Sequence, residues 1–480
     1  MRPILASLRA AVPLAVALLC VSCGTLSNMS NKLLGSSTPP VGTQGHVAGF
    51  LGGVVADEPR AVLIGRQVLS EGGSAADAAV AMGFTLAVTL PSRAGLGAGG
   101  ACLAYSPATN AINGGEPEAI MFTPIAPANP GPNADRPAAV PMFARGLYLL
   151  HARYGLEPFD GLIAPAERLA QLGVPTSRAL ADDISVVAGP LFADPAAHAA
   201  FSQDGAPLKE GQTLLQPALG ATLAQIRVSG VGDLYQGPLA RQLAQASAMA
   251  GGPLTLDELR RALPQLGTPL FAPASGDRVA FLPPPADGGL AALAAFTWLR
   301  QHPNDFGGAE ARALAVAARW RQGGVTAQQV LDSPSLPQAG LPGLPASTTF
   351  ATVDQNGNAV VCAVSMGNLF GTGRIVPGMG FLLAASPAAL PPPLYAAALA
   401  WNDHLHEFRA EVGGSGQAGA PMAVAVGMDN TLRNGHPMPA PVPDPGRANV
   451  IGCYGYLPGD KASCGWAADP RGAGMAMGGS

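Results

Sequence analysis

Ser347-Thr-Thr-Phe-Ala-Thr-Val-Asp354, continued by Gln355-Asn-Gly-Asn-Ala-Val360, is the most informative stretch of this 480-residue sequence. Val353-Asp354 and Ala359-Val360 have the composition of strand ends. The Asn356-Gly357 pair between them is the one that a tight hairpin turn with positive φ requires. The stretch therefore predicts a β-hairpin with a cluster of hydroxyl side chains at its head.

The segment before this hairpin, residues 333–346, is rich in proline and glycine, which predicts a surface loop. A cut in such a loop directly before Ser347 would free an α-amine beside a hydroxyl group. That amine has an unperturbed pKa near ~7.7–8.0 and can act as the base for its own side chain. Because runs of Ser and Thr at strand starts more often serve turns or sheet edges, the flanking motifs have to decide the interpretation.

The segment from Thr348 to Leu383 resembles the start of the catalytic small subunit of γ-glutamyltranspeptidases, which are self-processing N-terminal-nucleophile hydrolases. Two glycine-rich runs follow the pattern of that family without a gap: Asn368-Leu-Phe-Gly-Thr-Gly373 and Pro377-Gly-Met-Gly-Phe-Leu-Leu383. Aligned in this way, Ser347 takes the place of the nucleophile, and the bond between Ala346 and Ser347 is the one to be cut. A one-residue gap before Phe350 would put Thr348 there instead, and both alternatives stay open.

The front half of the chain continues the resemblance. Residues 61–80 look like the family's opening helix, glycine break and second helix. Gly72-Gly73 end the first helix, Ser74 caps the second, and Asp77 completes a capping box. The helix from Ala75 to about Leu90 is apolar nearly all round, so it must be buried. Further family motifs follow in order: Ala139-Val-Pro141, Arg153-Tyr-Gly155, Gln216-Pro217, Asp233-Leu-Tyr-Gln-Gly237 and Ala467-Ala-Asp-Pro-Arg471.

Several classes of function are excluded by composition and context. The run Gly95-Leu-Gly-Ala-Gly-Gly100 follows a helix and precedes a strand-like run, whereas a dinucleotide-binding loop follows a strand and opens a helix. A net charge of −4 with only 12% charged residues provides no basic surface for nucleic acid. The 48% hydrophobic content is sufficient for a large buried core.

The resemblance implies an α/β (α+β) fold, a four-layer αββα sandwich of the N-terminal-nucleophile hydrolase type. Periodicity alone predicts only mixed α/β structure with many Gly and Pro turns. The expected organisation is a signal peptide (1–23), a flexible tether (24–45), a large-subunit-like region (46–346) and a small-subunit-like catalytic region (347–480) that is shortened in its C-terminal part. The large and small fragments are expected to stay associated after cleavage.

The activity implied by the resemblance is acyl transfer from γ-glutamyl or related amides and peptides, without a cofactor or a metal. The hydroxyl of Ser347 attacks the amide carbonyl, and its own α-amine acts as base. Ser365 lies where the family has a Thr that hydrogen-bonds the nucleophile, and a serine hydroxyl can do the same. Asn368 stands one residue beyond the family's neighbouring Asn, which falls on Gly367.

The sequence departs from the family where the substrate is recognised. The family holds the glutamyl carboxylate with an Arg-Glu pair, but the aligned residues here are Gly115 and Glu116. It holds the amine with an acidic pair, where this chain has residues 384–389, Ala-Ala-Ser-Pro-Ala-Ala. Each lost charge-assisted bond costs roughly 1.5–3 kcal/mol, so an uncharged acyl group is expected to suit the site better. Arg93 or Arg374 could have taken over the carboxylate.

These losses leave an alternative from another class of protein. The family's late serine pair and its Gly-Gly oxyanion element have no clear match between Pro391 and Trp466. The chain could therefore be a catalytically inactive homologue that serves as an envelope lipoprotein scaffold or binding module. The retained hydroxyl cluster and hairpin favour the enzyme.

The first residues predict export. Arg2 and Arg9 flank a short basic region, residues 10–20 are apolar, and Ser22-Cys23 fits the bacterial lipobox, in which a small residue precedes the lipidated cysteine. Lipidation of Cys23 would anchor a periplasmic protein to the membrane through the tether.

Four other cysteines could form disulfide bonds, bind a metal or remain as thiols. Cys453 and Cys464 flank a Gly/Pro turn region and could form a disulfide in an oxidising periplasm. Their spacing fits no standard zinc motif, which argues against a metal site. Cys102 and Cys362 fall in strand-like runs and are expected to be buried thiols.

Overall fold

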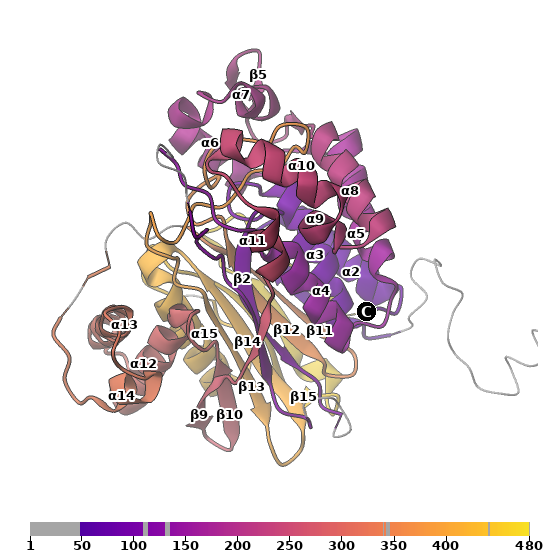
Figure 1. Cartoon of the computed structure of the whole chain (residues 1–480). Helices are drawn as coiled ribbons and strands as arrows, with labels where there is room; N and C mark the ends of the chain where they lie inside the picture. Colours follow the sequence, from indigo (N-terminus) through magenta and orange to yellow (C-terminus); the bar gives the residue numbers. More distant parts are fainter. Residues whose placement is uncertain are drawn as a thin grey trace, which may run out of the picture. The chain divides into compact units, whose positions relative to one another are not determined.

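The structure, a computed structural model, describes residues 49–108, 114–129, 135–338, 340–341, 346–439 and 442–479. All of them belong to one compact unit, Val47–Ser480 (Figure 1). The predicted signal peptide, the tether and Cys23 lie outside the described residues. Within the described ranges, no helix has the length and hydrophobicity needed to cross a bilayer.

The described chain alternates helices and strands along its length. The helices are α2 (Pro59–Ser70), α3 (Ala75–Thr89), α4 (Phe143–Tyr154), α5 (Phe159–Leu172), α6 (Arg178–Leu191), α7 (Pro195–Phe201), α8 (Pro217–Ser229), α9 (Asp233–Gln236), α10 (Pro238–Ala246), α11 (Leu256–Arg261), α12 (Asp287–Gln301), α13 (Phe306–Arg321), α14 (Ala327–Asp332) and α15 (Ala420–Asn434). The strands of the two large sheets are β1 (Gly52–Ala56), β2 (Gly99–Tyr105), β3 (Glu118–Phe122), β8 (Gln265–Gly267), β9 (Leu270–Ala274), β10 (Asp277–Phe281), β11 (Thr348–Asp354), β12 (Ala359–Ser365), β13 (Ala396–Asn402), β14 (Glu407–Ser415), β15 (Arg447–Leu457), β16 (Cys464–Ala468) and β17 (Met475–Gly479). Four two-residue strands form two small hairpins: β4 (Val174–Pro175) with β7 (Thr213–Leu214), and β5 (Ser202–Gln203) with β6 (Ala206–Pro207).

Two antiparallel sheets are stacked between two layers of helices. The first sheet has the order β17-β1-β11-β12-β2-β3-β8, and the second has the order β16-β15-β14-β13-β10-β9. One apolar core joins the first sheet to α2–α5, a second lies between the sheets, and a third joins the second sheet to α12, α13 and α15. Figure 1 shows α2–α5 on one side of the sheets and α12–α15 on the other. The predicted four-layer αββα sandwich is confirmed.

Helix α3 follows from its sequence. The Ser74 hydroxyl accepts from the Asp77 N–H at 3.1 Å, and the Asp77 carboxylate accepts from the Ser74 N–H at 2.9 Å, which is the predicted capping box. Such a cap stabilises a helix by about 1 kcal/mol. All residues of α3 are buried, as an apolar helix without a polar face requires. Because α3 packs on β11 and β12, it supports the hairpin that carries the hydroxyl cluster.

The hairpin of β11 and β12 forms at the predicted place, with a looser turn than the Asn-Gly pair suggested. Four residues connect the strands, and of the pair only Gly357 has a positive φ, +83°. The Asp354 carboxylate holds the turn by accepting from the N–H groups of Asn356 and Asn358, at 2.8 and 3.1 Å. The side chain of Asp354 thus replaces part of what a two-residue turn would supply.

Strands from before and after the predicted cut between Ala346 and Ser347 are paired with each other in both sheets. In the first sheet β11 and β12 lie between β1 and β2, and in the second sheet β10 pairs with β13. The first sheet also joins both ends of the described chain, because Gly52 of β1 pairs with Gly479 of β17. A cut before Ser347 would therefore leave two fragments that share two sheets and their cores.

The cysteines of the described chain form two cross-strand disulfides. One joins Cys453 and Cys464, which are opposite each other in β15 and β16. The other joins Cys102 of β2 and Cys362 of β12, where the sequence predicted free thiols. That prediction is wrong because the register places these two residues directly opposite each other, although 260 positions separate them in sequence.

Candidate active site

The structure places Ser365, at the end of β12, beside the peptide bond between Ala346 and Ser347, which the sequence predicted to be cut. The Ser365 hydroxyl donates to the carbonyl oxygen of Ala346 at 2.7 Å, and it accepts from the Gly367 N–H at 2.9 Å. Ser365 is buried and pairs with Gly99 of β2, and the residue before it, Val364, pairs with Thr348 of β11. A hydroxyl donating to this carbonyl polarises it toward nucleophilic attack.

Ser347 and Thr348 have different environments. Ser347 lines a cavity of about 360 Å³ together with Ala346. The Thr348 side chain is fully buried, and its hydroxyl donates to Asp57 Oδ2 at 2.9 Å. Of the two residues proposed as nucleophile, Ser347 is therefore the one that reaches a cavity.

Asp57 and Asn449 hold the hydroxyl cluster in place, and sequence reasoning missed both. Asp57 Oδ2 accepts from the Thr349 N–H at 3.1 Å in addition to the Thr348 hydroxyl. Asn449 Nδ2 donates to Asp57 Oδ1 and to the Thr349 hydroxyl, at 2.9 Å each. Asp57 follows β1 and Asn449 belongs to β15, so the network ties the start of β11 to both sheets. Asp57 stands directly after the apolar run Val54-Val55-Ala56, which was the available signal.

The cavity beside Ser347 is strongly charged. Its ionisable lining residues come from five separate segments: Asp57, Arg93, Arg178, Asp182, Asp183, Arg447 and Arg471. Arg93 makes two bonds of 2.7 Å to Asp183, whose carboxylate also accepts from Ser92 at 2.6 Å. A polar cavity of this kind suits a substrate with charged groups better than an apolar acyl chain.

The turn between β14 and α15 forms another wall of this cavity. Ser415, Gly416 and Gln417 line it, and the short 3₁₀ helix Gln417–Gly419 leads into α15. Gly416 and Gln417 both have positive φ, +104° and +54°. For Gln417 that is an unusual conformation, since non-glycine residues rarely adopt it. The turn lines the same cavity as Ser347, so its backbone N–H groups are the candidates for the oxyanion element.

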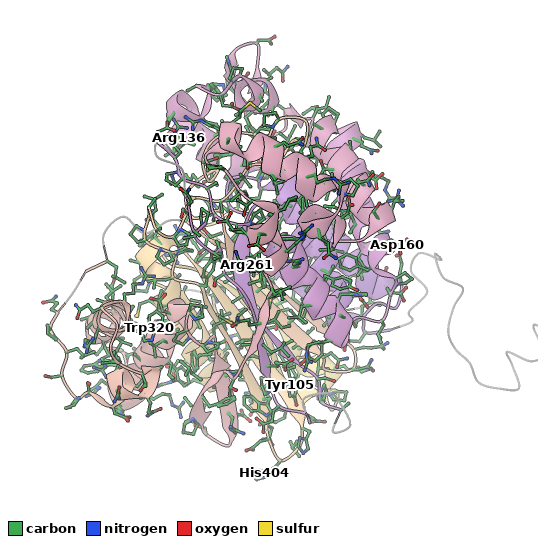
Figure 2. The ribbon with its side chains drawn as sticks, viewed as in Figure 1. Tyr105, Arg136, Asp160, Arg261, Trp320 and His404 are labelled. Carbon is green, nitrogen blue, oxygen red and sulfur yellow. A yellow bond between two sulfur atoms is a disulfide. The ribbon has the colours of Figure 1, made fainter. Side chains whose placement is uncertain are left out.

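The structure corrects the placement of Gly115 and Glu116, which the sequence predicted to contact the substrate. They precede β3 at the end of the first sheet near Tyr105, about 20 Å along β2 from Gly99 and Ser365. A Cβ on Gly115 would lie 3.4 Å from His406 Nδ1, and Glu116 pairs with Arg278 at 3.0 Å. Figure 2 shows Tyr105 and His404 at the lower end of the sheets and Arg136 at the upper end.

Other residues expected to hold the substrate serve different purposes. Arg93 is paired with Asp183, and Arg374 makes two bonds of 2.7 Å to Asp135. Asn368 is exposed and lines a neighbouring cavity with Arg136 and Thr372. Ala384 and Ala385 donate backbone N–H bonds to the carbonyls of Gly97 and Met366, which is a structural role.

Comparison with known proteins identifies the family to which this chain is similar. The sequence profile of the family described as Gamma-glutamyltranspeptidase matches residues 61–324, more than half of the chain. The chain is 29% identical over 385 residues to a glutathione hydrolase proenzyme of Escherichia coli, covering 69% of this chain and 65% of that protein. It is 33% identical over 251 residues to a glutathione hydrolase proenzyme of Bacillus subtilis, covering 50% and 43%. The chain thus spans less than two thirds of the length of these relatives.

A solved structure extends the likeness over nearly the whole chain. The cephalosporin acylase of Bacillus halodurans superposes with a TM-score of 0.73 at 20% identity and covers 92% of this chain and 97% of its own. Four layers and a buried hydroxyl residue at the head of a central hairpin define the N-terminal-nucleophile hydrolase fold. Within that class, the chain belongs to the γ-glutamyltranspeptidase family.

Proposed function

We propose that this chain is a self-processed acyl transferase or hydrolase that acts on amides through an acyl-enzyme at Ser347. The observation that carries the proposal is the 2.7 Å hydrogen bond from Ser365 to the Ala346 carbonyl, on the bond that must break. It is supported by the cavity that Ala346 and Ser347 line together. The family relatives support γ-glutamyl amides such as glutathione as the first substrates to test.

Self-processing would begin with attack of the Ser347 hydroxyl on the Ala346 carbonyl carbon. The C–N bond between the two residues breaks, the nitrogen keeps the electron pair and takes up a proton, and an ester to the Ser347 oxygen forms. Water then hydrolyses the ester, which leaves a carboxylate on Ala346 and a free α-amine on Ser347. The Ser365 hydroxyl stabilises negative charge on the Ala346 oxygen during attack.

Acyl transfer would reuse the same atoms. The freed α-amine takes the proton of the Ser347 hydroxyl as that oxygen attacks the substrate carbonyl, and it returns the proton to the leaving amine. The turn Ser415–Gln417 supplies backbone N–H groups for the oxyanion. Water or an amine then takes the acyl group. Neither step requires a cofactor or a metal ion.

The processing proposal predicts two fragments in freshly purified wild-type protein. One ends at Ala346, and the other, residues 347–480, begins with Ser347. The two should co-elute on size exclusion, because they share both sheets. Denaturing electrophoresis with N-terminal sequencing of the small fragment is the direct measurement.

The outcome of this experiment also decides between the two classes of function. A new terminus at Thr348 would shift the nucleophile by one residue. A single intact chain without a new terminus would favour an inactive family member that acts as an envelope scaffold.

We also propose that the mature chain is a periplasmic lipoprotein attached through Cys23. The apolar run of residues 10–20 before Ser22-Cys23 supports this proposal. A Cys23→Ser variant is then expected to move from the membrane fraction to the soluble periplasmic fraction, which immunoblotting of fractionated cells measures. Unchanged partitioning of the variant would contradict the lipid anchor, and Ser22→Ala, which keeps a small residue before the cysteine, is the matched control.

A further inference from the structure

The arginines of the cavity beside Ser347 differ in how their charge is balanced. Arg93 pairs with Asp183 at 2.7 Å, and Arg447 pairs with Asp444 at 2.7 Å. Arg471 pairs with Asp469 at 2.6 Å and with Asp444 at 3.1 Å. Each of these guanidinium groups has a carboxylate partner within the protein, so none of the three carries an uncompensated charge.

Arg178 is the exception in this cavity. Its Nη2 donates to the carbonyl oxygen of Gly472 at 2.6 Å, and it has no carboxylate partner in the described part of the chain. The residues outside the described ranges contain no Asp or Glu side chain. A carbonyl accepts a hydrogen bond without neutralising the cation, and the remaining donors of Arg178 stay available.

We propose that Arg178 binds a carboxylate on the acyl group of the substrate and thereby sets the specificity of the site. This assignment rests on the proposed acyl-transfer function. We place the carboxylate on the acyl group because Ala346 lines the same cavity as Arg178. In the proposed self-processing, Ala346 is the residue whose acyl group is transferred to Ser347. A guanidinium can bind a carboxylate through two parallel hydrogen bonds, which fixes the orientation of the group as well as its charge.

The assignment replaces the sequence-based expectation of an uncharged acyl group. That expectation followed from Gly115 and residues 384–389, and the structure places Gly115 at the far end of the sheet. Helix α6 brings a different arginine to Ser347, together with Asp182 one turn further along the same helix. Asp182 makes the cavity compatible with an ammonium group beside the carboxylate.

The test uses four 4-nitroanilides with one leaving group and matched acyl chains: butanoyl, glutaryl, 4-aminobutanoyl and γ-glutamyl. Glutaryl is butanoyl with a terminal carboxylate, and γ-glutamyl adds an amine to glutaryl. Processed wild-type protein is expected to show kcat/KM at least about tenfold higher for glutaryl than for butanoyl, the effect of one charge-assisted hydrogen bond.

Variants test whether Arg178 causes the preference for glutaryl over butanoyl. Arg178→Gln is expected to lower the ratio of kcat/KM for glutaryl to kcat/KM for butanoyl by about 10- to 100-fold, whereas Arg178→Lys keeps part of the preference. Arg168→Gln removes an exposed arginine of α5 outside this cavity and should leave this ratio unchanged. Equal turnover of glutaryl and butanoyl, or an unchanged preference in Arg178→Gln, would overturn the assignment.

A binding measurement separates this assignment from the proposed catalysis. The cavity and Arg178 are both present in the uncut chain, so Ser347→Ala protein should bind glutaramate, which has one carboxylate, more tightly than butanamide, which has none, in calorimetry. The double variant with Arg178→Gln should lose that difference. Preferential glutaramate binding by a protein that neither cuts itself nor turns over amides would support the assignment of Arg178 and contradict the acyl-transfer function. Absence of the difference would overturn Arg178 even in an active enzyme.

Discussion

Ser347→Ala is expected to leave the chain uncut and without amidase activity. The variant removes the one hydroxyl of the cluster that lines the cavity next to the Ala346 carbonyl, so neither the ester nor the acyl-enzyme can form. Loss of a nucleophilic serine costs on the order of 10⁶ in kcat where it has been measured in a serine hydrolase. Denaturing electrophoresis after prolonged incubation and anilide turnover provide the two readouts.

Two further variants make this prediction specific. Ser347→Thr keeps a hydroxyl and should still cut at the same bond. Thr348→Val keeps the shape of the side chain while removing the hydroxyl that donates to Asp57, and it should retain cleavage before residue 347. If Thr348→Val blocks cleavage while Ser347→Ala does not, the nucleophile is Thr348 and the cavity assignment is wrong.

The parts of the fold that were predicted correctly depend on local chemistry. Helix α3 follows from its capping box and its uninterrupted apolar run, both readable within some twenty residues. The β11–β12 hairpin follows from a turn flanked by strand-forming residues. The four-layer arrangement came from the family resemblance, because alternation of polar and apolar residues is lost in strands that are buried on both faces.

The parts that sequence reasoning missed depend on contacts between distant segments. Asp57 is 291 positions from Thr348 and 392 from Asn449, so no local pattern joins them. The lack of a carboxylate partner for Arg178 in the described part of the chain can be recognised only after the other arginines of the cavity have been matched to their carboxylates. The error at Gly115 was one of register, because the end of β3 that lies beside Gly99 is the one after Phe122. There Pro124 packs against Gly99.

The second prediction with a large expected effect concerns Glu411 and the pH dependence of the free energy of unfolding. It lies in β14, paired with Leu399 and Ile451, and its side chain is fully buried. Neither carboxylate oxygen makes a hydrogen bond of normal geometry in the described part of the protein, and the backbone of Thr352 only partly offsets the effect of burial. Burial therefore raises the pKa of Glu411 well above its ordinary value, and the folded protein holds this carboxyl in the neutral form.

The sign of the effect follows from the proton that the folded state retains. Above the unfolded-state pKa of about 4.5, the unfolded chain has lost the Glu411 proton while the folded chain keeps it. The contribution of Glu411 to stability is therefore complete in acid and declines as the pH rises toward the folded-state pKa. The decline is about 1.4 kcal/mol for each pH unit in that window.

Glu411→Gln is expected to remove this slope, since the amide is neutral at every pH, and Glu411→Leu should in addition stabilise the protein at neutral pH by removing an unpaired polar group. Urea unfolding at pH 5, 6, 7 and 8 gives the free energy of unfolding. A Ser347→Ala background keeps one uncut chain in every sample, so that fragment dissociation does not enter the measurement.

The quantity that matters is the difference between parent and variant at each pH, because other buried carboxyls with raised pKa, such as Asp287 and Glu58, contribute equally to both. Glu210→Gln, at an exposed turn, is the matched control and should leave the slope unchanged. A difference between parent and Glu411→Gln that does not grow from pH 5 to pH 8 would mean that Glu411 is ionised in the folded protein and that burial does not raise its pKa.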